Sequence, residues 1–266
     1  MADADIGVFG GSGFYSFVDV VEEVELETPY GTPSAPVVIG DVEGRRVAFL
    51  PRHGRSHELP PAAVPYRANV WAMRELGVRR IIGPCASGAL QPELALGSFV
   101  VCDQFVDRTW GRADSFYPGP ETVHVSAADP YCADLRRILV EAARELGIPV
   151  RDGGTVVVVQ GPRFSTRAES RWFGEAGWHV INMTAYPETI LARELELCYA
   201  NVSMITDYDV GIDGIEPVSS EAVVRVFDEN NARLRELLLA AIPRIGPQPR
   251  DACASALTGA RVAPTG

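Results

Sequence analysis

Apolar residues recur along this chain with two periods, and segments of the two kinds alternate. Short apolar runs at 5–9, 78–83 and 154–160 predict buried strands, because they are rich in Val, Ile or Phe and are followed by Gly or Pro. Apolar positions at helical spacing predict amphipathic helices over 62–77 and 131–146. This alternation favours an α/β fold. The remaining predicted strands are at 18–27, 36–42, 45–50, 98–106, 178–183 and 198–206. The remaining predicted helices are one capped by Ser165 or Thr166, one that begins at Pro187 and one over 219–241.

The segments between these elements also carry expectations. Residues 10–13 (GGSG) predict a tight turn after the first strand, and the small residues of 84–90 predict a second turn. The 107–129 segment is long for a connection, so we expect a lid or an interface. We expect a single domain over 1–266, with a mobile tail at about 247–266, because no repeat or linker divides the chain and its end is small and polar.

Composition excludes several classes of protein. At 266 residues and 47% hydrophobic content, the chain can build one large α/β core. Its formal net charge of −11 argues against nucleic acid as a partner, so any bound anion must be held locally by Arg, His or backbone amides. No apolar run reaches the roughly 20 residues that span a bilayer, and the acidic N-terminus is unlike a signal peptide. We therefore expect no membrane partner and a cytoplasmic protein.

Cysteine and histidine spacing gives no metal motif. The five cysteines are widely spaced and include no C-x-x-C, which predicts reduced thiols rather than a disulfide frame or zinc ribbon. Cys85 follows a predicted strand, but nothing local activates it as a nucleophile, which favours a packed thiol. His53 and His57 are four residues apart, yet Gly54 opposes a helix and no third ligand is near. We predict no metal.

The stretch 181–209 holds the most informative polar residues. Asp207 and Asp209 follow the predicted strand 198–206, and side chains at i and i+2 of an extended chain point to the same side. Acids at a strand end can accept hydrogen bonds from an amine and deliver a proton to a ring nitrogen. The alternative is a solvated Asp-x-Asp turn. Phe164, at another strand end, would stack on an aromatic ligand or else pack in the core.

Two more strand ends have groups suited to an anion. Backbone amides of the glycine-rich turn and the Ser12 hydroxyl can approach an anion closely. A dinucleotide fingerprint is the alternative, but Ser16 occupies the third glycine position and a strand follows. Arg52 and His53 form a second candidate, because a guanidinium fork and an imidazole can clamp phosphate.

Taken together, these segments resemble the trimeric purine nucleoside phosphorylases, and within them the 5′-methylthioadenosine phosphorylases. The matching segments occur in family order from residue 6 to about 240. They are GVFGGSGFY, TPYGTPS, LPRHGRSH, DQFVDRT, QGPRFSTRAES, INMTAYPE and ITDYD.

The resemblance implies a single three-layer α/β/α domain with a mixed, distorted central sheet, and a homotrimer with sites at subunit borders. It implies phosphorolysis of a 5′-modified 6-aminopurine nucleoside, with inorganic phosphate as co-substrate and no cofactor. Asp207 and His53 would be catalytic. Phosphate would contact Ser12, Arg52, His53, Cys85, Ala86 and Thr184; the nucleoside would contact Phe164, Ser165, Met183, Asp207, Asp209 and Val223, with His124 reaching a neighbouring subunit's site.

Some positions depart from the family pattern. Cys85 stands where a phosphate-contacting Thr is usual, and the 210–217 stretch and the tail differ from the family's sequences. Because the resemblance implies that both regions can shape the 5′ pocket, the substrate class stays open to a 5′-deoxy-5′-halo-adenosine or to a broader range of purine nucleosides. A nucleosidase that uses water and a nucleotide-binding sensor are two further hypotheses for the function.

Overall fold

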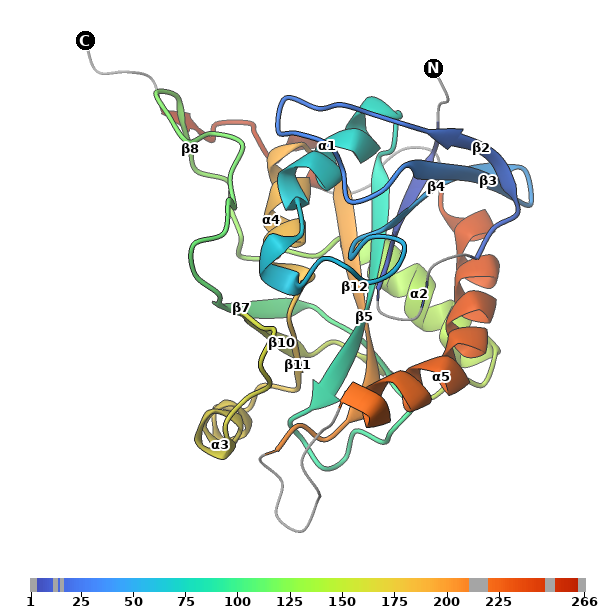
Figure 1. Cartoon of the computed structure of the whole chain (residues 1–266), viewed down its shortest axis with the longest axis vertical. Coiled ribbons are helices and arrows are strands. Elements are labelled where there is room, and N and C mark those ends of the chain that lie inside the picture. The colour runs from blue at the N-terminus through green and yellow to red at the C-terminus, as the bar shows by residue number, and fades with distance from the viewer. Residues whose placement is uncertain (1–3, 12–13, 15–16, 211–219, 247–251, 263–266) are drawn as a thin grey trace.

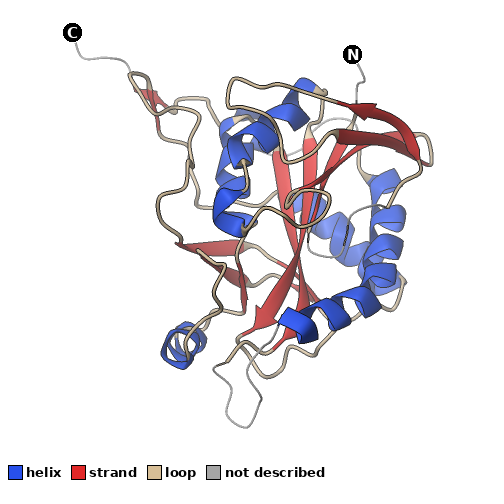
Figure 2. Cartoon of the chain, viewed as in Figure 1, coloured by secondary structure: helices blue, strands red, loops and turns tan. Residues whose placement is uncertain are grey.

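The computed structural model describes residues 4–11, 14, 17–210, 220–246 and 252–262. A mixed sheet runs through its centre, and helices cover both faces (Figures 1 and 2). The sheet has 11 strands, and its main path has the order β2-β3-β4-β1-β5-β11-β10-β7. These strands are β1 (Ile6–Gly10), β2 (Val20–Val24), β3 (Val37–Val42), β4 (Arg45–Pro51), β5 (Arg80–Ala89), β7 (Gln104–Arg108), β10 (Thr155–Val159) and β11 (Val180–Asn182).

The sheet forks at β5. On one side β5 pairs in parallel with β12 (Cys198–Asp207), and beyond the fork its C-terminal end pairs antiparallel with β11. Two short strands, β6 (Phe99–Val101) and β9 (Val150–Asp152), continue the β12 branch. The fork distorts the sheet and separates the ends of β11 and β12, which makes room for a cavity between them.

Helices form one layer on each face of the sheet (Figure 1). On one face, α1 (Tyr66–Glu75) and α4 (Ala185–Glu194) share a buried apolar cluster with β1 and β5. On the opposite face, α2 (Ala133–Glu145) and α5 (Ser220–Ala241) pack in a second cluster that includes Leu135, Leu139, Leu234 and Leu237. The three-layer α/β/α fold with a mixed, distorted sheet, predicted from the resemblance, is confirmed.

Two predicted boundaries were wrong. The segment 84–90 is not a turn, because β5 continues to Ala89 and pairs residue by residue with β12. Long-range pairing has overridden the local preference of small residues for turns. The predicted strand 98–106 is two strands, β6 and β7, which break at Cys102 and Asp103 and belong to different branches of the sheet.

Of the C-terminal segment expected to be a mobile tail, the structure describes residues 252–262, and these contain regular structure. Residues Ala252–Ser255 form a 3-10 helix, and β13 (Arg261–Val262) pairs antiparallel with β8 (Thr122–Val123). This small sheet attaches the end of the chain to the 107–129 segment (Figure 1). Within the described residues, none of the helices is both long and apolar enough to cross a membrane.

Candidate active site

A cavity of about 980 Å³ opens where β4, β5, β10, β11 and β12 end or separate. Ligand sites of open α/β sheets commonly lie outside the carboxyl ends of the strands. The cavity brings together ten residues that the sequence proposed for the site: Arg52, His53, Cys85, Ala86, Phe164, Ser165, Met183, Thr184, Asp207 and Asp209.

Asp207 and Asp209 meet at the cavity through an irregular strand end rather than an extended one. The pairing of β12 with β5 shifts register between Ile205 and Asp207, and such a bulge re-aims the side chains that follow it. Asp209 then adopts a left-handed φ of 50°, while its N–H donates to Asp207 Oδ1 at 2.8 Å. The extended backbone expected for this pair was therefore wrong, but both carboxylates do face one cavity, as expected.

Both carboxylates hold protons more tightly than ordinary aspartates. Burial raises the pKa of Asp207 and that of Asp209, because a carboxylate is poorly solvated there. Asp209 is 3% exposed, and its Oδ2 has no hydrogen-bond partner among the described residues. The pair is thus not a solvated turn, and Asp209 Oδ2 is open to a hydrogen bond from a ligand.

Gly88 leaves space for this pair. A Cβ at Gly88 would lie 2.8 Å from Asp207 Oδ1 and 3.0 Å from a methyl carbon of Ile181. A larger residue would push the Asp207 carboxylate out of position.

The 161–166 segment forms the wall near these acids. Thr166 caps α3 (Arg167–Glu175), with a reciprocal capping box between Thr166 and Glu169. Arg163 pairs with Glu169 at 2.8 Å, which fixes the segment further. Phe164 is 37% exposed and is therefore not a core residue. Ser165 Oγ is buried without a hydrogen-bond partner among the described residues and, like Asp209 Oδ2, belongs to a cavity-lining side chain.

Arg52 also lines the cavity, beside Pro84 of β5 whereas Asp207 lies beside Gly88, and its guanidinium is largely engaged by protein groups. Its Nε and Nη2 donate to the two carboxylate oxygens of Glu188 at 2.7 and 3.0 Å, and its Nη1 donates to Pro84 O at 2.7 Å. Tyr199 donates its hydroxyl to the same Glu188 at 2.6 Å. A guanidinium has five N–H bonds, so one on Nη1 and one on Nη2 remain for a ligand.

His53 is a neutral acceptor rather than an additional cation. Burial, with the neighbouring Arg52 charge, lowers the pKa of His53 to about 4. Its Nδ1 lies 2.9 Å from Leu59 O, and because a carbonyl only accepts, Nδ1 carries the proton. Nε2 is then an acceptor. The neutral imidazole therefore has no N–H left for phosphate, and it can instead accept from a protonated phosphate oxygen.

Cys85 and Thr184 sit side by side in the cavity wall. Cys85 Sγ is 3.3 Å from Thr184 Oγ1 and accepts from Asn201 Nδ2 at 3.4 Å. Burial raises the pKa of Cys85, so the thiol stays protonated and unreactive, as predicted for a packed thiol. Thr184 directly precedes α4, and its N–H and that of Ala185 donate to Asn182 Oδ1 at 3.3 Å, which fixes this part of the cavity wall.

Three proposed residues are not placed in this cavity. Ser12 lies outside the described residues. Val223 is on α5, but its side chain lies outside the described part of the structure. His124 is exposed and does not line the cavity of its own chain; its N–H donates to Ala260 O at 2.9 Å, next to the β8–β13 pair.

A family model described as the phosphorylase superfamily matches residues 5–243. The chain belongs to this superfamily. It is 53% identical to a purine nucleoside phosphorylase of Streptomyces coelicolor over 268 residues, covering 96% of this chain and 95% of the relative. It is 52% identical to an S-methyl-5′-thioadenosine phosphorylase of Pyrococcus abyssi, and the match covers 95% of this chain and 97% of that relative.

Solved structures agree with this assignment. A methylthioadenosine phosphorylase from Schistosoma mansoni in complex with adenine superposes with a TM-score of 0.93 at 36% identity, covering 97% of this chain and 99% of the matched chain. A mutant of an adenosine/methylthioadenosine phosphorylase from the same organism, in complex with methylthioadenosine, gives a TM-score of 0.91 at the same identity and coverage.

Sequence reasoning missed three contributors to this phosphorylase site. Glu188 and Asn182 lie inside the matched segment INMTAYPE, and their place in that segment could have identified them as site residues. Glu188 is fully buried against Arg52, and Asn182 lines the cavity with an Nδ2 that has no partner among the described residues. Gly88 had no signal beyond being a small residue near a predicted turn.

Proposed function

We propose that this phosphorylase cleaves 5′-methylthioadenosine with phosphate, giving adenine and 5-methylthioribose 1-phosphate. The observation that carries this proposal is one cavity lined by two proton-retaining carboxylates, Asp207 and Asp209, and by the Arg52 guanidinium and the Thr184 hydroxyl. The reaction separates charge, since the ribosyl ring becomes cationic while the purine leaves as an anion. These two sets of groups match the two demands.

In the proposed reaction a phosphate oxygen bonds to C1′ as the bond from C1′ to N9 breaks. Asp207 accepts a hydrogen bond from the 6-amino group and supplies or relays a proton to N7. Asp209 and Ser165, each with an unsatisfied polar atom, also face the base, and Phe164 stacks on it. Met183 lies under the ribose. Phosphate is held by Arg52, His53, Ala86, Thr184 and Ser12, and Cys85 lies beside Thr184.

We also propose a cytoplasmic homotrimer that acts in purine salvage. His124 is exposed and lies outside the cavity lining of its own chain, so the role that the resemblance implies requires a neighbouring subunit. Phosphate is the co-substrate, and the proposed chemistry uses no cofactor or metal.

Base release tests the reaction. Methylthioadenosine, methylthioinosine, adenosine and inosine are each incubated with enzyme, with and without phosphate, and the free base is measured. We expect phosphate-dependent release that is fastest from methylthioadenosine. Release at the same rate without phosphate would indicate a nucleosidase, and binding without release would indicate a sensor.

A broader purine nucleoside phosphorylase is the second candidate. The 53% identical relative from Streptomyces coelicolor, which has that name, favours it. The same assay separates the two, because comparable efficiency on inosine and methylthioadenosine would support the broader activity. A 5′-deoxy-5′-halo-adenosine that outperforms methylthioadenosine would assign the halogenated substrate class instead.

A further inference from the structure

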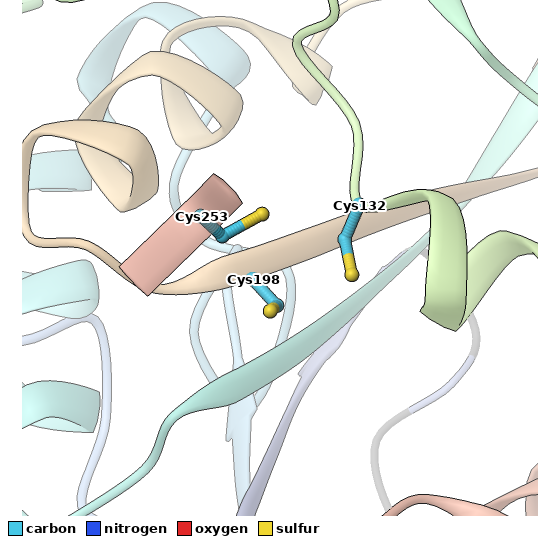
Figure 3. Close-up of side chains that lie close together, drawn as sticks. All are labelled: Cys132, Cys198 and Cys253. Carbon is cyan, nitrogen blue, oxygen red and sulfur yellow. The ribbon is translucent and has the colours of Figure 1, made fainter. Parts of the chain in front are cut away.

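Three cysteines from distant parts of the sequence meet in the core on the α2 and α5 side of the sheet (Figure 3). Cys132 precedes α2, Cys198 begins β12, and Cys253 lies in the C-terminal 3-10 helix. Their three sulfur atoms all lie within 4.8 Å of one another, and all three residues are buried. Because they come from three separate elements, their convergence depends on the complete fold.

The spacing of the sulfurs suits one shared centre. Three sulfurs bonded at about 2.3 Å to a common atom lie up to about 4 Å apart. Bringing these sulfurs to that separation requires a movement of less than about 1 Å, which rotation of cysteine side chains supplies.

The surroundings decide which centre fits. The three cysteines belong to an apolar cluster with Leu135 and Ile138, and within the described residues no fourth His, Cys, Asp or Glu joins the group. Zinc in structural sites takes four ligands, one more than this cluster offers. A complex of three thiolates with a monovalent or divalent ion would also have a net negative charge, which an apolar core does not stabilise. A trivalent, three-coordinate thiophilic centre gives a neutral product and needs no further ligand.

We propose that Cys132, Cys198 and Cys253 form a binding site for trivalent arsenic of the arsenite class. Three S–As bonds form while three As–O bonds of arsenous acid break, and the three thiol protons leave in three molecules of water. Arsenic remains trivalent, so no oxidant or reductant is required. The product joins the C-terminal segment covalently to α2 and β12.

Binding at this site has a structural consequence. The C-terminal segment continues from Cys253 to β13, which pairs with β8, and Ala260 O accepts the N–H of His124. Arsenic at the cluster therefore anchors the segment that supports the 107–129 loop. It should stabilise the folded protein, because the unfolded chain does not hold the three thiols together.

The test uses the full chain, reduced with a phosphine because dithiols compete for arsenite. Serine variants Cys132→Ser, Cys198→Ser and Cys253→Ser are compared with the parent, and Cys102→Ser is the matched control, since Cys102 is another buried thiol outside the cluster. Cys132→Ser keeps its helix cap, because Cys132 Sγ accepts from Leu135 N and serine is a good N-cap. Circular dichroism establishes that each variant is folded.

We expect one arsenic per chain by native mass spectrometry, the loss of three titratable thiols, and an arsenite-dependent rise in melting temperature in both the parent and Cys102→Ser. Each cluster variant should bind at least tenfold more weakly and lose the rise. No binding by the folded parent would overturn the proposal. So would equal binding by any one cluster variant, because two thiols would then suffice. Arsenic binding and melting temperature do not measure base release, so the proposal stands or fails independently of the proposed function.

Discussion

Arg52 and Glu188 form a bidentate ion pair, 2.7 and 3.0 Å long, in which neither side chain is exposed to solvent. The pair joins the end of β4 to α4 beside the cavity. Charge is thus balanced inside the protein before any substrate arrives, while two N–H groups of Arg52 stay available. A single substitution at Arg52 therefore affects both folding and ligand binding.

Arg52→Ala should destabilise the protein by about 3–5 kcal/mol, because it leaves Glu188 as a buried charge without its partner. The double variant Arg52→Met with Glu188→Gln should recover most of this loss, since Gln keeps an acceptor for the Tyr199 hydroxyl. Urea denaturation without phosphate measures the unfolding free energies of the single and double variants. Equal stability of the single and double variants would show that the two residues are not energetically coupled.

The double variant also isolates the role of Arg52 in binding. If Arg52 clamps phosphate, KM for phosphate should rise at least tenfold while KM for the nucleoside changes far less, since about 1.4 kcal/mol of lost interaction corresponds to a factor of ten. Steady-state base release provides both constants. An equal rise in the two constants would count against the clamp.

Asp207→Asn should change the preference between bases. Efficiency on 6-aminopurine nucleosides should fall at least tenfold, because one good hydrogen bond lost in the transition state costs about 1.4 kcal/mol or more. Efficiency on 6-oxopurine nucleosides should fall less or rise, because an Asn amide can donate to O6. The measured quantity is the amino-to-oxo ratio of kcat/KM, mutant over parent. An unchanged ratio would show that Asp207 does not recognise the base. The candidate would then be Asp209, and Asp209→Asn is the variant that tests it.

His53 should make stability depend on pH. Its pKa is lowered from 6.5 to about 4, so between these values the unfolded chain binds more protons than the folded one. The contribution of His53 is present above pH 6.5 and is lost as pH falls toward 4. His53→Asn should flatten this part of the pH profile of the unfolding free energy, measured by urea denaturation without phosphate. The exposed His124→Asn is the control, and an identical slope in His53→Asn and the parent would contradict the prediction.

A homotrimer should appear in sedimentation at micromolar concentration. His124→Ala should then weaken nucleoside binding while leaving the chain's own cavity lining intact, because His124 does not contribute to it. Sedimentation velocity and KM for nucleoside check the two parts. A fully active monomer would contradict the prediction that the active site is shared between subunits.

The sequence by itself determined the α/β class, most of the longer strands and helices, and ten cavity-lining residues. Periodicity and turn residues are local signals. A matched segment such as INMTAYPE also identifies the site residues that lie within it. Tertiary structure alone decided the long-range relationships. Glu188 pairs with a residue 136 positions away, β5 continues through small residues because β12 pairs with it, and a bulge with a left-handed Asp209 aims both acids. The three clustered cysteines meet only when α2, β12 and the C-terminal segment pack. Such contacts depend on packing between distant segments, which no local pattern of polar and apolar residues encodes.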